Sequence, residues 1–158
     1  LRPSQGGVKP FWYLRFEDVT VEHLIRGGGQ GRIVKGTYRK STPVAVKEID
    51  LFSGAEAEYR TFCAEVEIMH RLRHPHIVHP IGGYFPFREE RHSPFLVMEL
   101  VDGCDLSRAI HDKQFQRLIQ GTARKIDVAR QIAMGMSYMH QMDVIHRDLK
   151  PANVLVPG

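Results

Sequence analysis

The sequence predicts an α+β protein with a β-rich first half and a helix-rich second half. Short apolar runs separated by turn residues occupy 19–49 and 76–100, which indicates several short strands. An amphipathic helical pattern interrupts them at 55–74, and a longer one covers 122–142. Because the strands are joined by tight connections, we expect an antiparallel meander with one main helix, followed by the start of a helical half.

Glycine, proline and polar residues bound each expected strand. A first strand begins near Val19 and ends at the glycine turn RGGGQG, and RIVKGTY (32–38) and VAVKEI (44–49) follow it. HIVHPIGGYF (76–85) and PFLVMEL (94–100) predict two further strands. The polar loop between these two is expected to be exposed to solvent.

Helical spacing of apolar residues defines the expected helices. Phe62, Val66 and Met69 mark one face of 55–74, and Pro75 is expected to stop that helix. A short helix is expected at 106–114. For 122–142 we expect Thr122 to act as the cap. The expected apolar stripe of that helix consists of Ile126, Ala129, Ile132, Ala133, Met136 and Met139.

The composition of the 158 residues is that of a globular protein, with 42% hydrophobic and 25% charged residues. No apolar run approaches the roughly 18–20 residues of a membrane span, so no membrane segment is expected. The two cysteines, Cys63 and Cys104, lack CxxC spacing, which argues against a zinc site or a disulfide framework. These features predict a reducing, cytoplasmic (intracellular) location.

The charge balance is mildly basic. Lys and Arg number 22 and Asp and Glu number 18, which leaves a net charge of +4 without an evident block of like charges. A solvated surface explains this excess better than nucleic-acid binding, so no nucleic-acid partner is expected.

The glycine turn at 26–31 is the first candidate binding feature. Glycines such as Gly28 and Gly31 let backbone N–H groups approach a phosphate closely, although a glycine-rich hairpin alone explains the same pattern. A P-loop is excluded because Thr37 stands where lysine is required. A dinucleotide fingerprint is excluded because the turn leads into a strand rather than a helix.

Lys47 and Glu65 form a second candidate pair. On a strand, Ala45 and Lys47 point to the same face, beside whatever the glycine turn covers. Considered alone, Lys47 is best explained as an exposed lysine on an edge strand, but its place next to the glycine turn favours phosphate binding. Glu65 shares a helix face with Met69, which should carry it toward the sheet and toward Lys47.

The loop HRDLKPAN gathers three chemically active side chains within six residues. The Asp148 carboxylate can accept a proton. The Lys150 ammonium can neutralise a transferring phosphate, and the Asn153 oxygen suits Mg²⁺, which prefers oxygen ligands.

These motifs together resemble those of protein kinases. HRDLKPAN is similar to the kinase catalytic loop, VAVK to the third-strand lysine motif and LVMELVDG to the hinge, in the family's order over residues 18–158. The KPAN form resembles serine/threonine kinases, and the stretches before the glycine turn and at 74–85 resemble the tyrosine-kinase-like group. The resemblance implies a bilobal fold with a lead-in at 1–17, an N-lobe at 18–98, a hinge at 99–104 and a partial C-lobe at 105–158.

The resemblance also implies roles for the candidate catalytic residues. Lys47 would hold the ATP phosphates and pair with Glu65, and Asp148 would be the catalytic base. Lys150 would stabilise the γ-phosphate and Asn153 would bind Mg²⁺. The implied substrates are ATP and the Ser/Thr hydroxyl of a protein. Of the neighbouring residues, His146 would be a structural histidine and Arg147 the partner of a phosphorylated activation loop.

Further positions would bind the nucleotide. A loop over the phosphates, an adenine sandwich, a gatekeeper, two hinge backbone contacts and a ribose contact are implied. The loop over the phosphates would consist of Gly28, Gly29, Gln30 and Gly31, and the adenine sandwich of Ile25, Ile33, Ala45 and Leu155. Met98 would be the gatekeeper. The hinge backbone contacts would come from Glu99 and Val101, and the ribose contact from Asp105.

Two departures from the family's pattern support an alternative. Arg26 replaces the first glycine of the turn and Gln30 replaces the usual aromatic at its tip. No Asp-Phe-Gly triplet occurs in the 158 residues, so we interpret the chain as a fragment and expect it to lack kinase activity when expressed alone. The alternative function is a pseudokinase, which would be a nucleotide-binding or scaffolding module.

Overall fold

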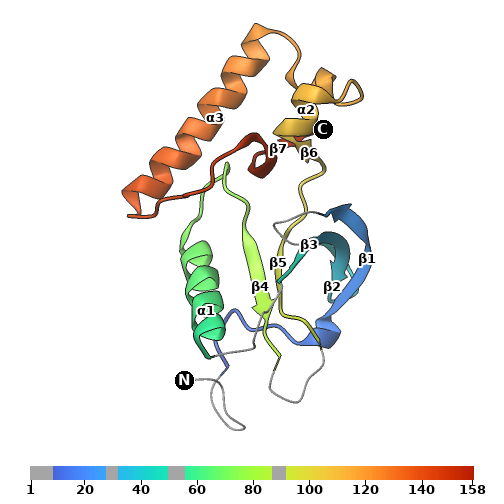
Figure 1. The fold of residues 1–158 in the computed structure, drawn as a ribbon, viewed down its shortest axis with the longest axis vertical. Helices are drawn as coiled ribbons and strands as arrows, with labels where there is room; N and C mark the ends of the chain where they lie inside the picture. The colour runs from blue at the N-terminus through green and yellow to red at the C-terminus, as the bar shows by residue number, and fades with distance from the viewer. Residues whose placement is uncertain (1–8, 28–31, 50–55, 87–91) are drawn as a thin grey trace. The chain divides into compact units, whose positions relative to one another are not determined.

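The computed structural model describes residues 9–27, 32–49, 56–86 and 92–158. The chain divides into two compact units, each considered separately below (Figure 1). Unit 1 comprises Leu1–Arg71 and His79–Leu100, and unit 2 comprises Leu72–Val78 and Val101–Gly158.

A five-stranded antiparallel sheet forms the frame of unit 1. The expected meander is confirmed for β1, β2 and β3, whereas β5 lies between β3 and β4. A short 3₁₀ turn, η1 (Phe16–Asp18), precedes it. The spatial order of the strands is β1-β2-β3-β5-β4. Their bounds are β1 (Val19–Arg26), β2 (Ile33–Tyr38), β3 (Thr42–Glu48), β4 (Pro80–Tyr84) and β5 (Phe95–Glu99).

A cluster of buried apolar side chains covers one face of this sheet. Val34 pairs with Val46, and Val46 pairs with Val97, so the three valines lie side by side on one face. Each is no more than 1% exposed, and together with Leu14, Tyr84 and Phe95 they form a buried cluster. The alternate strand residues, including Ala45 and Lys47, therefore point to the opposite face.

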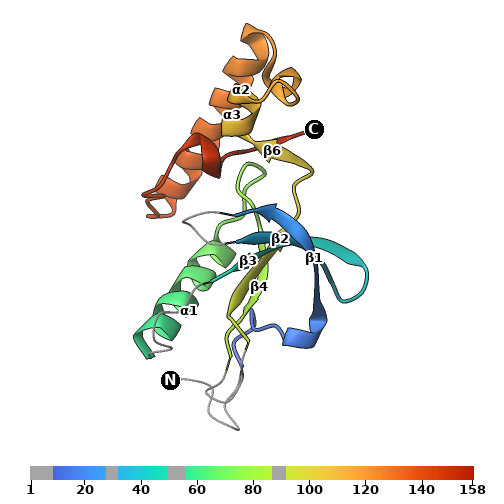
Figure 2. The same cartoon turned by 45° about the vertical axis from the view of Figure 1, so that its right-hand side comes forward.

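Helix α1 (Glu56–Arg71) packs beside β4 in unit 1 (Figures 1 and 2). Phe62 and Val66 are buried from its predicted apolar face, in a cluster with Leu96 of β5. Met69 packs against that cluster, so the predicted stripe is confirmed. The helix ends before Pro75, as expected.

Residues 12–14, which precede the sheet, are part of the core of unit 1. Trp12 is 1% exposed and packs with the α1 cluster, and Leu14 belongs to the valine cluster. Tyr13 forms a parallel bridge with Gly83 of β4. Leu14 N donates to Gly83 O at 2.8 Å and Gly83 N donates to Trp12 O at 3.0 Å, so this segment covers part of the β4 edge.

Unit 2 is mainly helical, with a small two-stranded sheet. The strands β6 (Gly103–Asp105) and β7 (Leu155–Pro157) pair antiparallel. The helical elements are α2 (Leu106–His111), η2 (Gln116–Ile119), α3 (Thr122–Gln141) and η3 (Pro151–Asn153). Cys104, Ala109, Ile119 and Val156 form the buried core of this unit.

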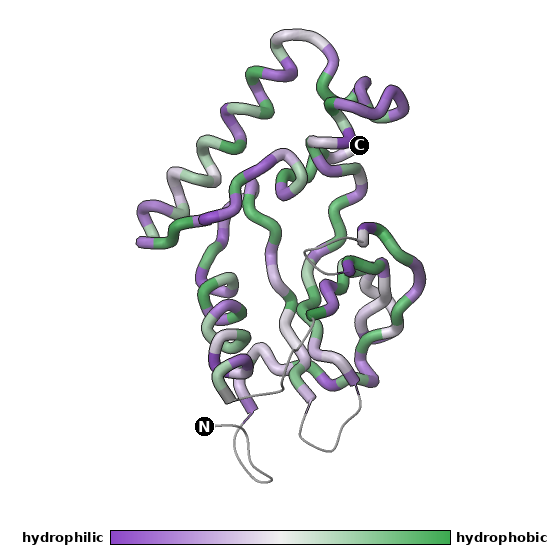
Figure 3. Tube along the Cα trace, in the orientation of Figure 1, coloured by the Kyte–Doolittle hydropathy of each residue, from purple (hydrophilic) through white to green (hydrophobic). Residues whose placement is uncertain are grey.

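The predicted stripe of α3 is correct only in part. Met139 is buried, but Ile126 is 63% exposed, and Ala129 and Ala133 are also exposed. Apolar and polar residues alternate along the helix (Figure 3). Gly135 is buried against the backbone of His76, where an added Cβ would lie 3.1 Å from the carbonyl oxygen. Because Gly135 allows this close approach, the side of α3 that carries Gly135 is the side that packs against His76.

The expected cap of α3 is also corrected. Thr122 is the first helical residue, and the N-cap position belongs to Gly121, which makes no side-chain cap hydrogen bond. Gly121 has φ of +83°, a conformation that glycine adopts without the steric penalty of other residues. The chain therefore enters the helix through a glycine turn rather than through a hydroxyl cap.

Candidate functional site

Asp148, Lys150 and Asn153 lie together in unit 2, as their spacing suggested. Lys150 Nζ lies 3.1 Å from Asp148 Oδ1. Asn153 Nδ2 donates to Asp148 Oδ2 at 2.8 Å and to the Asp148 carbonyl oxygen at 2.9 Å. The Asp148 carboxylate is therefore held from two sides, by an ammonium and by an amide.

The backbone of this loop explains the close grouping. Pro151 begins the 3₁₀ turn η3, where its fixed φ and missing N–H carry little cost. Asn153 N donates to Lys150 O at 2.9 Å, which folds Asn153 back toward Asp148. Arg147 adopts φ of +62°, and Asp148 N donates to His146 Nδ1 at 3.3 Å. His146 thus supports the loop, in agreement with the structural role expected for it.

The exposure of the loop suits a reaction with an external substrate. The Asp148 side chain is 50% exposed and that of Lys150 is 38% exposed. A carboxylate in this setting can accept a proton from a hydroxyl group brought to it. The neighbouring ammonium can stabilise negative charge on a phosphoryl group.

This loop can supply one oxygen ligand to Mg²⁺. The Asn153 amide must present its nitrogen to Asp148, because carboxylate and carbonyl oxygens only accept hydrogen bonds. Its Oδ1 therefore points away from these contacts and can serve a hard cation. Within the described ranges, no group of three or more His, Cys, Asp or Glu side chains could hold a metal ion. Phosphate and water oxygens would complete the coordination, as is usual for Mg²⁺.

Lys47 lies in unit 1 on a sheet face suited to a ligand. It pairs with Ile33 of β2 and with Leu96 of β5, and Ala45 pairs with Met98. Ile33, Ala45 and Lys47 are each half-buried on the face opposite the valine cluster. A flat apolar patch beside a cation is chemically suited to a purine base attached to a phosphate.

The expected pairing of Lys47 with Glu65 is not present in this structure. Both residues are described, and neither side chain makes an ion pair or hydrogen bond with another described residue. Glu65 is exposed on α1, while its neighbour Val66 is 1% exposed. The packing of Val66 and Phe62 fixes the rotation of the helix and leaves Glu65 at the margin of the buried stripe.

The glycine turn can be placed only at its ends. Gly28, Gly29, Gln30 and Gly31 lie outside the described residues. Arg26, expected to open the turn, is the last residue of β1 and pairs with Ile33. Ile25, expected against adenine, is 43% exposed in the same strand.

The expected gatekeeper, Met98, and the first residue of the expected hinge, Glu99, end strand β5. Met98 packs partly against the α1 cluster. Glu99 N donates to His79 O at 3.0 Å, and Glu99 Oε1 accepts from His79 N at 2.7 Å. The N–H of Glu99 is thus already engaged by His79 and is not available for the backbone contact expected there. Val101, in unit 2, is half-buried.

Asp105 and Leu155 are directly opposite one another in the β6–β7 ladder and therefore share a face. Leu155 is 43% exposed, whereas Cys104 and Val156 on the other face are buried. Asp105 also caps α2, because its Oδ1 accepts from Arg108 N at 3.0 Å. This capping role was missed at the sequence level, although Asp directly before a helical run is its usual signal.

None of the helices in the described part of the chain is both long enough and apolar enough to cross a membrane.

Comparison with known proteins matches the part of the chain that contains these motifs. The family described as protein tyrosine and serine/threonine kinase matches residues 19–158. LIM domain kinase 1 of Drosophila melanogaster is 33% identical over 148 residues, which cover 94% of this chain and 11% of that protein. Tyrosine-protein kinase Fer of Mus musculus is 32% identical over 145 residues, which cover 92% of this chain and 17% of Fer.

A plant kinase gives a similar result. Proline-rich receptor-like protein kinase PERK13 of Arabidopsis thaliana is 36% identical over 158 residues, which cover 96% of this chain and 21% of that protein. The chain thus spans a fifth or less of the length of most of these relatives, while the family match covers both units. The chain belongs to the protein tyrosine and serine/threonine kinase family.

Proposed function

We propose that this chain is part of an ATP-dependent serine/threonine protein kinase that transfers the γ-phosphoryl group to a protein hydroxyl. The geometry of the loop at 146–153 is the observation that carries the proposal. Asp148, Lys150 and Asn153 are within hydrogen-bonding or ion-pairing distance of one another, and each has a distinct chemical task.

The residues of unit 2 would act on the acceptor and on the transferred group. Asp148 would accept the proton of the substrate hydroxyl at a carboxylate oxygen. Lys150 would neutralise charge on the phosphoryl oxygens. Asn153 Oδ1 would hold Mg²⁺, whose contribution when bound is to neutralise the phosphate charge.

The residues of unit 1 would hold the nucleotide. Ile33 and Ala45 would contact the base, and Lys47 would bind the phosphates. The proposed serine or threonine specificity is based on Lys150 and on the resemblance of the KPAN sequence at 150–153 to that of serine/threonine kinases. The relatives include proteins named as tyrosine kinases, so the identity of the acceptor needs its own measurement.

The test has two parts. In the 158-residue chain, binding of a fluorescent ATP analogue with Mg²⁺ is expected, and it should weaken in Lys47→Met. In the longest chain that contains this sequence, phosphoamino-acid analysis of a mixed peptide substrate should show phosphoserine or phosphothreonine. Phosphotyrosine alone would overturn the specificity, and failure to bind the nucleotide would overturn the whole proposal.

A pseudokinase is the second candidate, favoured by two specific observations. Arg26 occupies the first glycine position of the turn, and Lys47 and Glu65 are not paired. A pseudokinase would bind ATP, or a partner, without turnover in the longest chain. Phosphate transfer there that disappears in Asp148→Asn would exclude it.

A further inference from the structure

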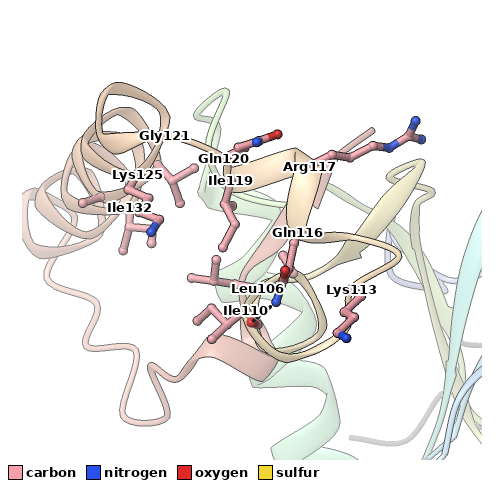
Figure 4. A pocket seen from close by; sticks show the side chains of 13 residues that line it. Leu106, Ile110, Lys113, Gln116, Arg117, Ile119, Gln120, Gly121, Lys125 and Ile132 are labelled. Atoms are coloured by element: carbon pink, nitrogen blue, oxygen red, sulfur yellow. Dashed lines mark hydrogen bonds between the residues drawn. The ribbon is translucent and has the colours of Figure 1, made fainter.

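Unit 2 carries an open groove that has no part in the phosphoryl-transfer chemistry. Its volume is about 840 Å³, and it lies between α2, η2 and α3. Leu106, Ile110, Ile119 and Ile132 supply apolar side chains from both walls (Figure 4). Ile110 is 41% exposed, so this apolar surface is accessible. The volume is within the usual range for a ligand-binding cleft.

The polar residues of the groove are basic or neutral. Its lining residues include Lys113, Arg117 and Lys125 and contain no Asp or Glu. Figure 4 shows Lys125 next to Ile132 on α3 and Lys113 at the opposite rim, while the Arg117 guanidinium extends outward. Lys113 and Lys125 make no ion pair with another residue of the described part of the chain.

The segment that forms this groove carries an excess of positive charge. Residues 106–132 contain six Lys or Arg and two Asp, a net charge of +4. The chain as a whole also has a net charge of +4, from 22 basic and 18 acidic residues. The remaining residues thus contain 16 of each sign and are neutral overall.

The acidic residues of this segment do not cancel the charge of the groove. Asp127 is bound by Arg130 at 2.7 Å, by Arg124 at 3.2 Å and by Gln131 at 2.7 Å. Asp112 accepts a hydrogen bond from the backbone N–H of Gln114. Neither side chain lines the groove. A ligand that brings its own negative charge is therefore needed for electrostatic complementarity.

We propose that this groove binds an acidic amphipathic helix of a partner protein. Apolar side chains on one face of such a helix would fill the space between Leu106, Ile110, Ile119 and Ile132, and flanking Glu or Asp residues would meet Lys113 and Lys125. A nucleic-acid backbone could use the cations but would leave the apolar walls exposed. The inference is independent of the proposed kinase reaction, because the groove contains none of the residues assigned to it.

The test uses the 158-residue chain and a synthetic helical peptide of about 18 residues. The peptide has Leu at i, i+3, i+4 and i+7 positions and Glu elsewhere, and a matched peptide has Lys in place of Glu. Fluorescence anisotropy should show binding of the acidic peptide and not of the basic one. The double variant Lys113→Glu/Lys125→Glu should bind the acidic peptide at least about tenfold more weakly, because like charges then face each other.

Two further variants make the result decisive. Lys40→Asp removes a surface cation in unit 1, at a turn position with positive φ that Asp tolerates, and should leave binding unchanged. Ile110→Ser should weaken binding without loss of the fold, because its side chain is already partly exposed. The double variant should gain affinity for the basic peptide, an outcome that a misfolded protein would not show.

Several outcomes would overturn the proposal. Equal binding of both peptides, or unchanged binding to the double variant, would remove the role of charge. Binding of phosphatidylserine vesicles or of duplex DNA without binding of the acidic peptide would replace the partner helix with another anionic partner.

Discussion

The amide of Asn153 is bonded to Asp148 twice, at the carboxylate and at the main-chain carbonyl. The two contacts, at 2.8 and 2.9 Å, fix the orientation of both side chains. Asn153 therefore orients the expected base as well as offering an oxygen to a cation. These two tasks can be separated by substitution.

Asn153→Asp keeps an oxygen for Mg²⁺ but loses both hydrogen-bond donors and places a second carboxylate beside Asp148. We expect kcat in the longest chain to fall by about 10²-fold, the scale for the loss of one preorganised donor, while the Mg²⁺ concentration needed for half-maximal rate changes little. Asn153→Ala should lower kcat and also raise that Mg²⁺ requirement. Steady-state kinetics over a Mg²⁺ series distinguishes the two, and identical Mg²⁺ curves would contradict the assignment.

Lys47→Met should reduce kcat/KM in the longest chain by about 10²-fold or more, because one electrostatic stabiliser is lost. Lys35→Met is the matched control. Lys35 lies on the same sheet face, where it pairs with Ala45. Equal losses in the two variants would mean that the general charge of the face, rather than Lys47 itself, is responsible.

Gly36→Ala should destabilise unit 1. An added Cβ would lie 2.6 Å from the carbonyl oxygen of Thr20, so the pairing of β1 with β2 would have to shift. A cost of about 1–3 kcal/mol in the free energy of unfolding is expected for such overpacking. Gly27→Ala is the control, because its nearest contact would be the flexible Leu24 side chain at 3.7 Å. Urea denaturation should show a loss for Gly36→Ala alone.

The Asp127 network should make stability depend on pH in acid. The pKa of Asp127 is lowered below its ordinary value, mainly by the hydrogen bond from Arg130. The charge of Arg130 and the hydrogen bond from Gln131 lower it further. The stabilisation is therefore present above the unfolded pKa, about 3.9, and is lost as the pH falls through the lower folded value. Asp127→Asn should flatten the pH dependence of urea midpoints in this acid range. An unchanged slope would show that the network does not contribute.

Burial raises the pKa of both the Cys63 and the Cys104 thiols. Both cysteines are free, and less thiolate is available at neutral pH than for an exposed thiol. Alkylation by iodoacetamide at pH 7.5 should therefore be much slower in the native chain than in urea. Equal rates at either cysteine would contradict its burial.

Much of the fold follows from local sequence patterns. The sheet strands alternate or lie between glycine and proline turns, and Phe62, Val66 and Met69 define the packed face of α1. The loop at 146–153 was also predictable as a group, because Asp148, Lys150 and Asn153 fall within six residues and Pro151 favours a turn between them.

Other features depend on packing that no local pattern encodes. The side of α3 that packs is determined by the contact of Gly135 with His76, which are distant in sequence. Trp12 is buried although glycine and proline surround its segment, since the β4 edge provides backbone partners. Glu65 shares a helical face with Met69, but the deeper burial of Val66 turns it outward.

The β6–β7 ladder is held by its backbone and by its buried face, which leaves its exposed face free to vary. At Gly103, an added Cβ would collide with the Val156 carbonyl oxygen, so the two strands depend on close backbone contact. Asp105 and Leu155 are held opposite each other by main-chain pairing and by the buried Cys104 and Val156, rather than by their own side chains. Mutation can therefore alter the exposed Leu155 with little effect on folding, so the chemistry of this face can change while the frame of the unit stays the same.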